Sequence, residues 1–182
     1  AETYLTRLVK KGYKVAICEQ VEDPKLAKGM VKREVTRVVT PGTTLNAQAL
    51  DESKNNYVMS IVYVSDRYGI SFADVTTGDY FVTEVDSARK LMDEICKFTP
   101  REVICNEALL MSGVELDDLK ERLNLVMYPL ESWYFDDELC KNTLREHFHV
   151  RSLEGLGVAD FGCGVIAAGA LLRYLTDTQK TS

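Results

Sequence analysis

The arrangement of hydrophobic periodicities after Tyr57 constrains this chain more than any other feature. Three consecutive segments have the composition and spacing of β-strands, and polar turns at Asp66–Gly69 and Thr76–Gly78 separate them. Segments with helical spacing then alternate with short apolar runs that are typical of buried strands. The expected strands are 56–66, 67–77, 78–86, 102–105 and 124–130, and the expected helices are 87–98, 113–123 and 136–148. Strands joined by short turns pair antiparallel and strands separated by helices pair in parallel, so the order predicts an α/β domain with a mixed sheet.

An unusually apolar helix is expected at residues 160–177. Its apolar residues recur at steps of three and four, namely at Phe161, Val165, Ala168, Leu172 and Leu175. A helix that is apolar over most of its circumference is normally buried inside a larger structure. Because the sequence also lacks an initiator Met, we expect it to be part of a longer protein. We expect this helix to fold back on the sheet, to pair with a second copy or to swap.

The first 42 residues differ in charge from the rest of the chain. They carry 9 Lys and Arg against 5 Asp and Glu, whereas residues 43–182 carry 13 against 23. A helix is expected to end at Gly12, and strands are expected at 13–18 and 31–39. The polar stretch 43–56 has no clear periodicity, so we interpret it as a linker. A basic unit joined to an acidic one indicates different partners, and any affinity for a polyanion would reside in the first unit.

Motifs and composition argue against several functions. There is no run of about 18 uncharged apolar residues, so no membrane span is expected. The sequence contains no P-loop, no glycine-rich dinucleotide motif and no nucleophile elbow. Its five cysteines are scattered and never spaced as C-x-x-C, which argues against structural zinc and favours buried thiols in a reducing cytoplasm. We therefore expect no catalytic residues and no metal ligands in this chain.

The order of strands and helices is also that of ribonuclease H-like folds, whose enzymes hold two metal ions with convergent carboxylates. The candidate ligands here are Asp66, Asp74, Asp79 and Glu84. Asp66 and Asp79 lie in or beside expected turns, and only Asp74 is centred in an expected strand. A metal centre needs several carboxylates that point to one place, and these are spread along the meander. A non-catalytic domain is therefore the favoured hypothesis, and a metal-dependent nuclease domain is the alternative. A stand-alone basic DNA-binding module is a third hypothesis.

Three segments, in order along the chain, resemble the MutS family of DNA mismatch-repair proteins. Gly12–Thr43 contains the pattern AICEQ…DP…KG-x-VKREV-x-R-x-VTPGT, which is similar to the end of that family's mismatch-binding domain. ISFADVTTGDYFVTE (Ile70–Glu84) resembles its connector domain, and Gly155–Thr181 resembles the start of its lever domain. The matches cover essentially the whole chain.

The resemblance implies a ribonuclease H-like connector domain without nuclease activity, preceded by an α/β remnant of the mismatch-binding domain. The implied divisions are 1–42 for that remnant, 43–56 for the linker, 57–150 for the connector and 151–182 for the start of the lever. In the family, the full-length protein is a dimeric clamp that finds mispaired or looped-out bases and uses ATP and Mg to recruit MutL.

The resemblance also implies which functions this chain lacks. The family's Phe-x-Glu mismatch reader lies upstream of its AICEQ segment, and Ala1–Val15 contains no Phe. The family's ATPase domain would lie far downstream. We therefore expect a connector and interaction module that binds no cofactor of its own.

The first set of implied site residues is basic. Lys28, Lys32 and Arg33 match the family's KG-x-VKR stretch, and we expect them near the DNA backbone in the full-length protein. Ion pairs with neighbouring acids would explain the same charges, and the candidate acids are Glu22, Asp23 and Glu34.

The second set lies on the expected helix 136–148, which the resemblance places on the surface that meets MutL. Asn142, Thr143 and Glu146 are the expected exposed positions. Leu139, Leu144 and Phe148 are expected to face the core. A plain surface helix is the alternative.

Overall fold

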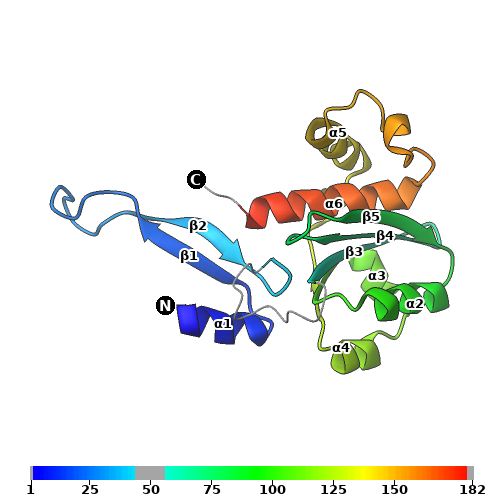
Figure 1. The fold of residues 1–182 in the computed structure, drawn as a ribbon, viewed down its shortest axis with the longest axis horizontal. Helices are drawn as coiled ribbons and strands as arrows, with labels where there is room; N and C mark the ends of the chain where they lie inside the picture. Colours follow the sequence, from blue (N-terminus) through cyan, green and yellow to red (C-terminus); the bar gives the residue numbers. More distant parts are fainter. Residues whose placement is uncertain (1, 44–55, 180–182) are drawn as a thin grey trace.

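A computed structural model describes residues 2–43 and 56–179 as a two-stranded hairpin and a five-stranded sheet with helices around it (Figure 1). The hairpin consists of β1 (Val15–Gln20) and β2 (Arg33–Val39), and α1 (Glu2–Lys10) precedes it. The sheet strands are β3 (Tyr57–Val64), β4 (Arg67–Asp74), β5 (Tyr80–Val85), β6 (Glu102–Cys105) and β7 (Val126–Pro129). The linker expected at 43–56 lies, apart from its two end residues, outside the described residues.

The sheet has the strand order β5-β4-β3-β6-β7. β3, β4 and β5 form an antiparallel meander, whereas β6 and β7 continue the sheet in parallel. The predicted mixed sheet is therefore confirmed. Val64 of β3 pairs with Arg67 of β4 across the two-residue turn Ser65-Asp66, and both turn residues have positive φ. Such a turn matches the twist of the two strands that it joins.

Helices cover both faces of the sheet (Figure 1). α6 (Gly162–Thr178) lies along one face, and α5 (Asp137–Phe148) packs on the outer side of α6. On the opposite face lie α2 (Ala88–Phe98), α3 (Glu107–Met111) and α4 (Asp117–Leu123). Two short 3-10 helices, η1 (Ser132–Phe135) and η2 (Leu153–Leu156), precede and follow α5. Within the described residues, no helix combines the length and the apolar character needed to cross a bilayer.

The hydrophobic core lies on both sides of the sheet. On the α2 side, Met59, Ile70 and Phe72 pack with helix residues that include Leu91 and Ile95. On the other side, Leu171 and Tyr174 of α6 pack against Val58, Ala73 and Ile104. The apolar helix folds back on the sheet of its own chain, which is one of the three arrangements expected for it.

Two glycines let α6 lie unusually close to its neighbours. A Cβ atom built at Gly69 of β4 would lie 2.1 Å from the carbonyl oxygen of Cys163, and one built at Gly169 would lie 2.5 Å from Cα of Cys140. Any larger residue would therefore push α6 away from β4 or from α5. The prediction of a turn at Asp66–Gly69 is wrong for residues 67–69, which belong to β4. Local composition does not distinguish a turn glycine from one that contacts a helix.

The helix expected at 113–123 begins later than predicted, and α3 was not expected. Gly113 has φ +79° and separates α3 from α4. Asn106 extends the end of β6, because its side chain exchanges hydrogen bonds of 3.1 and 3.0 Å with the backbone of Tyr63. The same side chain accepts a bond from the Leu109 amide and so begins α3. The strand expected at 13–18 also begins two residues later, at Val15.

Candidate nucleic-acid interface

The β1–β2 hairpin presents a face that mixes basic and apolar side chains. The strands pair antiparallel from Val15–Val39 to Gln20–Arg33, with an irregularity between Ile17 and Cys18. Arg33 and Val35 share one face of β2, opposite Gln20 and Cys18, but the irregularity places Arg37 opposite Ile17, so the predicted alternation from Arg33 to Arg37 is broken there. Arg33, Val35 and Arg37 are all exposed.

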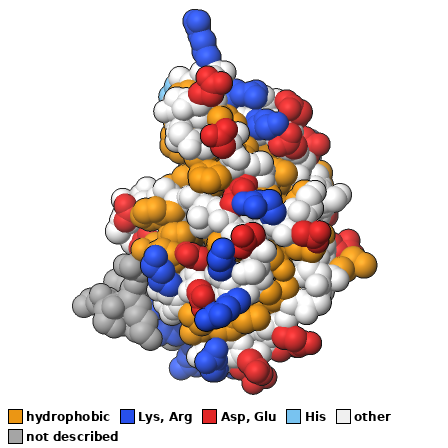
Figure 2. All heavy atoms as spheres, turned by 90° about the vertical axis from the view of Figure 1, so that its right-hand side faces the viewer, with side chains coloured by type: hydrophobic (Ala, Val, Ile, Leu, Met, Phe, Trp, Pro, Cys, Tyr) orange, Lys and Arg blue, Asp and Glu red, His pale blue; other side chains and the backbone are white. Residues whose placement is uncertain are grey.

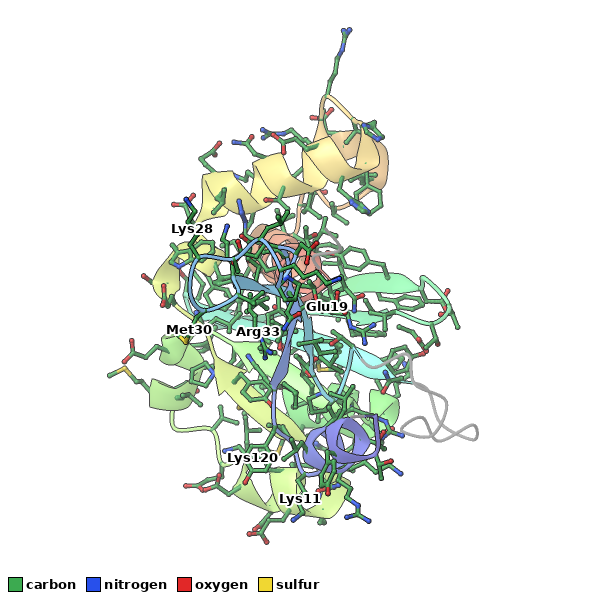
Figure 3. All side chains as sticks on the ribbon, turned by 90° about the vertical axis from the view of Figure 1, so that its left-hand side faces the viewer. Lys11, Glu19, Lys28, Met30, Arg33 and Lys120 are labelled. Carbon is green, nitrogen blue, oxygen red and sulfur yellow. The ribbon has the colours of Figure 1, made fainter. Side chains whose placement is uncertain are left out.

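The loop between the strands, residues 21–32, projects away from the five-stranded sheet (Figure 1). Figure 3 shows Lys28 and Met30 in this loop, and Arg33 with Glu19 on the strands that lead from it. Met30 is 98% exposed. The acids of the loop bind its own backbone, since Asp23 Oδ1 accepts from the Lys25 amide at 2.9 Å and Glu22 Oε1 accepts from the Lys32 amide at 2.5 Å.

The three basic candidates therefore differ in their surroundings. The ammonium of Lys32 forms an ion pair of 2.6 Å with Glu34, and its hydrogen bond to that carboxylate raises the pKa of Lys32. Within the described parts of the chain, Lys28 and Arg33 have no ion-pair partner, and both are exposed. An ion pair thus occupies Lys32 but leaves Lys28 and Arg33 open to an external anion.

On the face of the molecule opposite the hairpin, acidic and basic side chains are interspersed (Figure 2).

The root of the hairpin is built from the TPGT turn, Thr40–Thr43. The turn closes on itself, because the two Thr hydroxyls lie 2.6 Å apart and the Thr43 amide donates to the Thr40 carbonyl. Three side chains from later parts of the sequence then form hydrogen bonds with the backbone of this turn. Gly42 donates its amide to Glu102 Oε2 at 2.9 Å, Asn56 donates to the Gly42 carbonyl at 3.0 Å, and Gln179 donates to the Thr43 carbonyl at 3.3 Å.

The other strand of the hairpin is held beside β7. The hydroxyl of Tyr128 donates to the Gly12 carbonyl, and the ammonium of Lys14 lies 3.9 Å from the centroid of the Tyr128 ring and 4.9 Å from that of Tyr174. Burial lowers the pKa of Lys14, although the nearby Glu102 carboxylate acts in the opposite direction. Burial, together with that carboxylate, raises the pKa of Tyr128 to about 12.

Sequence reasoning missed Glu102 and Asn56 as functional positions. The one available signal was a Glu at the start of an otherwise apolar four-residue strand, because a buried carboxylate requires a hydrogen-bond donor. The sequence does not show which donor Glu102 binds, because that donor, the amide of Gly42, lies 60 positions away in the chain.

On α5, the candidate MutL-facing residues are not equally available. Asn142 and Glu146 are exposed, but Thr143 is half-buried and donates its hydroxyl to the Leu139 carbonyl at 2.8 Å. Asn142 Oδ1 accepts from Arg145 at 2.6 Å. Of the residues expected to face the core, Leu144 is buried and Leu139 is half-buried. Phe148 is 39% exposed, so its predicted burial is wrong. Phe148 lies in the last turn of α5, where its ring lies near those of Tyr80 and His147.

The four candidate metal ligands bind the protein instead of converging. Asp66 accepts from Tyr63 at 2.7 Å, Asp79 accepts from Thr77 at 2.8 Å, and Asp74 accepts from the Thr76 amide at 2.8 Å. Asp66 and Asp74 lie at opposite ends of β4, roughly 25 Å apart at the usual strand rise. Among the described residues, no three His, Cys, Asp or Glu side chains are grouped so that they could hold a metal ion.

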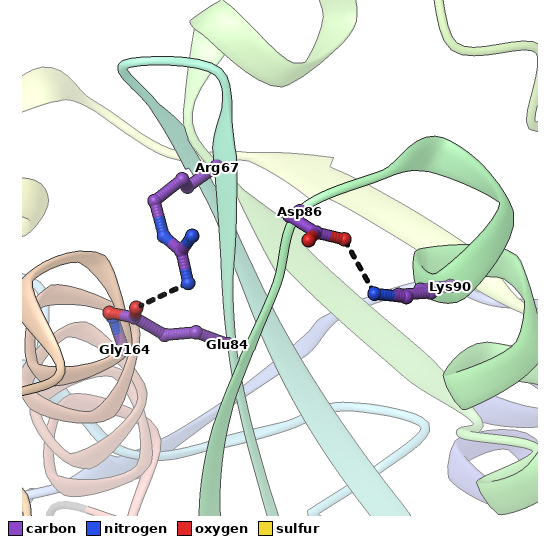
Figure 4. Close-up of polar contacts among 5 residues, drawn as sticks. All are labelled: Arg67, Glu84, Asp86, Lys90 and Gly164. Carbon is purple, nitrogen blue, oxygen red and sulfur yellow. Dashed lines mark hydrogen bonds and ion pairs between the residues drawn. The ribbon is translucent and has the colours of Figure 1, made fainter.

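Glu84, the fourth candidate, joins β5 to the start of α6 (Figure 4). Its Oε1 accepts from the Gly164 amide at 2.9 Å, and its Oε2 lies 3.3 Å from Arg67. The side chain of Glu84 is therefore used to position α6.

Family comparisons agree with the two-part architecture of a hairpin unit and a mixed-sheet unit. A model described as MutS domain II matches residues 56–182, and one described as MutS domain I matches residues 1–48. The chain therefore belongs to the MutS family.

Curated relatives of this chain share the name DNA mismatch repair protein MutS. The chain is 57% identical over 182 residues to the DNA mismatch repair protein MutS of Lachnoclostridium phytofermentans, and all of this chain aligns with 20% of that protein. It is 44% identical to the protein of the same name from Ruminiclostridium cellulolyticum and 43% identical to that from Acetivibrio thermocellus. All of this chain aligns with 21% of each of these two proteins. The chain thus spans about a fifth of the length of the curated relatives that it matches.

Proposed function

We propose that this chain is a non-catalytic connector and interaction module of a DNA mismatch-repair protein, and that its hairpin lies beside the DNA backbone. Lys28 and Arg33 carry this proposal, since they are exposed cations of the hairpin that have no ion-pair partner among the described residues. Lys and Arg side chains on a projecting element are the groups that proteins use to contact phosphates. The nuclease alternative finds no support in the matched families.

Charge reversal of the hairpin tests its contact with DNA. In the full-length protein, Lys28→Glu, Lys32→Glu and Arg33→Glu together should weaken duplex binding. They should also reduce the slope of log affinity against log salt by up to about 0.9 for each lost phosphate contact. A matched control is Lys90→Glu, Lys120→Glu and Lys141→Glu, which removes three cations that pair with acids elsewhere. Equal affinity and slope in the hairpin triple variant and the unmodified protein would contradict the proposal.

A titration of this chain alone tests its role as an interaction module. We expect it to bind MutL, and to show no preference for a duplex with a G·T mismatch over a matched duplex. Selective binding of the mismatch would show that the proposed division of functions is wrong.

We propose a ribonuclease H-like topology for the mixed-sheet unit. The support is the central first strand, the antiparallel meander on one side of it and the two parallel strands on the other. In this proposal, residues 1–42 form the hairpin unit and residues 43–56 the linker. The connector continues beyond residue 150 to the end of α6, because α6 supplies one side of its core.

The surface that meets MutL is proposed on α5, at Asn142 and Glu146. In the full-length protein, Asn142→Lys with Glu146→Lys should reduce MutL recruitment and leave mismatch binding unchanged. The control is Asp118→Lys with Glu121→Lys on α4, which changes two exposed positions on the other side of the sheet. Normal recruitment by the α5 variant would remove this proposal.

The functions of the whole protein are proposals by homology. We propose that the full-length protein is a cytoplasmic homodimer that binds mispaired or looped-out bases and signals to MutL. We assign ATP and Mg to regions of the relatives that this chain does not cover.

A further inference from the structure

A buried glutamate occupies a position where the sheet itself needs no charge. Glu102 begins the inner strand β6 and is 0% exposed. Its neighbours on that strand, Val103, Ile104 and Cys105, are buried and apolar. Burying a carboxylate is costly unless donors satisfy it, so the Glu102 side chain is explained by what it binds.

The donor that Glu102 binds is the end of the hairpin. Oε2 accepts the Gly42 amide at 2.9 Å, directly after the buried Pro41 of the TPGT turn. The turn fits very closely here, because a Cβ built at Gly42 would lie 2.3 Å from Cγ2 of Val58 and 3.4 Å from Cβ of Glu102. Only glycine brings the backbone close enough for this bond.

Around this bond, the two ends of the hairpin meet the same group of side chains. Lys14 precedes β1 and lies over the rings of Tyr128 and Tyr174, and the Glu102 carboxylate acts electrostatically on all three residues. Oε1 of Glu102 and the hydroxyl of Tyr174 are buried without a hydrogen-bond partner among the described residues. Among the described residues, the bond from the Gly42 amide is the one with full hydrogen-bond geometry, and the Tyr174 hydroxyl acts on the same carboxylate more weakly.

We propose that Glu102 is a positioning residue for the hairpin: its carboxylate, acting through the Gly42 amide, fixes the direction in which the hairpin leaves the sheet. Asn56 assists from the opposite side of the same residue, since it binds the Gly42 carbonyl. The loop 21–32 lies far from this root, so its orientation depends on the contacts made there.

Hydrogen exchange on this chain tests the inference without any nucleic acid. In Glu102→Ala, the amides of β1 and β2 should exchange about tenfold faster, while those of β3 and β4 are unchanged, because a local anchor opens without global unfolding. Glu102→Gln keeps an acceptor oxygen and should give a smaller increase. Asn56→Ala should accelerate the same amides by a separate route, so the inference remains testable if Glu102→Ala does not fold.

The matched control is Glu84→Gln, because Glu84 also accepts a glycine amide at 2.9 Å but joins β5 to α6. It should leave exchange in β1 and β2 unchanged. Equal acceleration of hairpin and sheet amides in the Glu102 variants would show an ordinary stabilising role and would overturn the inference. Unchanged exchange in β1 and β2 would overturn it as well.

The consequence for DNA rests on the proposed function. In the full-length protein, Glu102→Gln should lower duplex affinity about tenfold and leave the salt slope unchanged, because the same cations reach the phosphates from a less fixed hairpin. A full-length protein whose duplex affinity did not depend on the hairpin cations would refute the proposed function and leave the exchange result standing. If the amides of β1 and β2 exchanged faster in the Glu102 variants but duplex affinity stayed the same, the effect of Glu102 on DNA binding would be refuted and its anchoring of the hairpin would stand.

Discussion

At the scale of single residues, the buried carboxylates of this chain are explained by the groups that they bind. Asp74 is 3% exposed at the end of β4, and its Oδ1 accepts both the amide and the hydroxyl of Thr76. Burial acts to raise the pKa of Asp74, but the hydrogen bonds from Thr76 and from backbone amides outweigh it and leave the pKa below the ordinary 3.8. The ionised form is therefore the one that stabilises the fold.

This shift has a defined effect on stability. A carboxylate whose pKa is lowered by folding contributes fully above its unfolded pKa, about 4, and the contribution is lost as the pH falls through the folded value. We expect Asp74→Asn to lower the free energy of unfolding at pH 7 and to flatten its decline below about pH 4. Urea unfolding between pH 7 and pH 3 measures both, with Asp118→Asn on the surface of α4 as the control. Identical acid dependence in Asp74→Asn and the unmodified chain would exclude this role.

At the scale of elements, the contact between α6 and β4 depends on a glycine in the strand. Gly69→Ala should lower the free energy of unfolding by about 3 kcal/mol, because its Cβ would meet the backbone of Cys163 at 2.1 Å. Gly155→Ala is the matched control, since its Cβ would meet nothing within 4 Å. Urea midpoints compare the two. Equal midpoints for both variants would show that α6 can move away from β4 at little cost.

The elements predicted from periodicity were largely found, because alternation and helical spacing are local properties of the sequence. The meander, both parallel strands and the apolar helix are examples. Contacts across the chain were not predictable in the same way. The bond between Gly42 and Glu102 joins residues 60 positions apart, and the role of Gly69 depends on the placement of Cys163. For the candidate site, the sequence indicated the basic stretch but not that Glu34 pairs with Lys32 while Lys28 and Arg33 have no such partner among the described residues.

At the scale of the whole molecule, the two-sided core divides the five cysteines into two classes. Cys18 and Cys96 are exposed, whereas Cys105, Cys140 and Cys163 are buried. Burial raises the pKa of the Cys105 and Cys163 thiols to about 11 and that of Cys140 to about 12. Since the thiolate is the reactive form, these three thiols are protected both by access and by protonation.

We expect a thiol reagent at pH 8 to label two cysteines per chain rapidly under native conditions and all five in denaturant. Mass spectrometry of peptides should place the rapid labels on Cys18 and Cys96. Rapid native labelling of Cys140 would mean that α5 separates readily from α6, and rapid labelling of Cys163 would mean that α6 separates readily from β4.

The anchoring of the hairpin by later residues has a consequence for synthesis on the ribosome. β1 and β2 can pair as soon as residue 39 has emerged. The hydrogen bond from Tyr128 to the Gly12 carbonyl forms only after Tyr128 has been synthesised, 116 residues further along the chain than Gly12. At 5–20 residues per second, translation of the 89 residues from Val39 to Tyr128 takes roughly 4 to 18 s. During this time the nascent chain carries a two-stranded hairpin with exposed cations and without its contact to β7, and an isolated hairpin is marginally stable at best. The cations are thus available to polyanions, the ribosomal RNA included, before the rest of the fold gives the hairpin its direction.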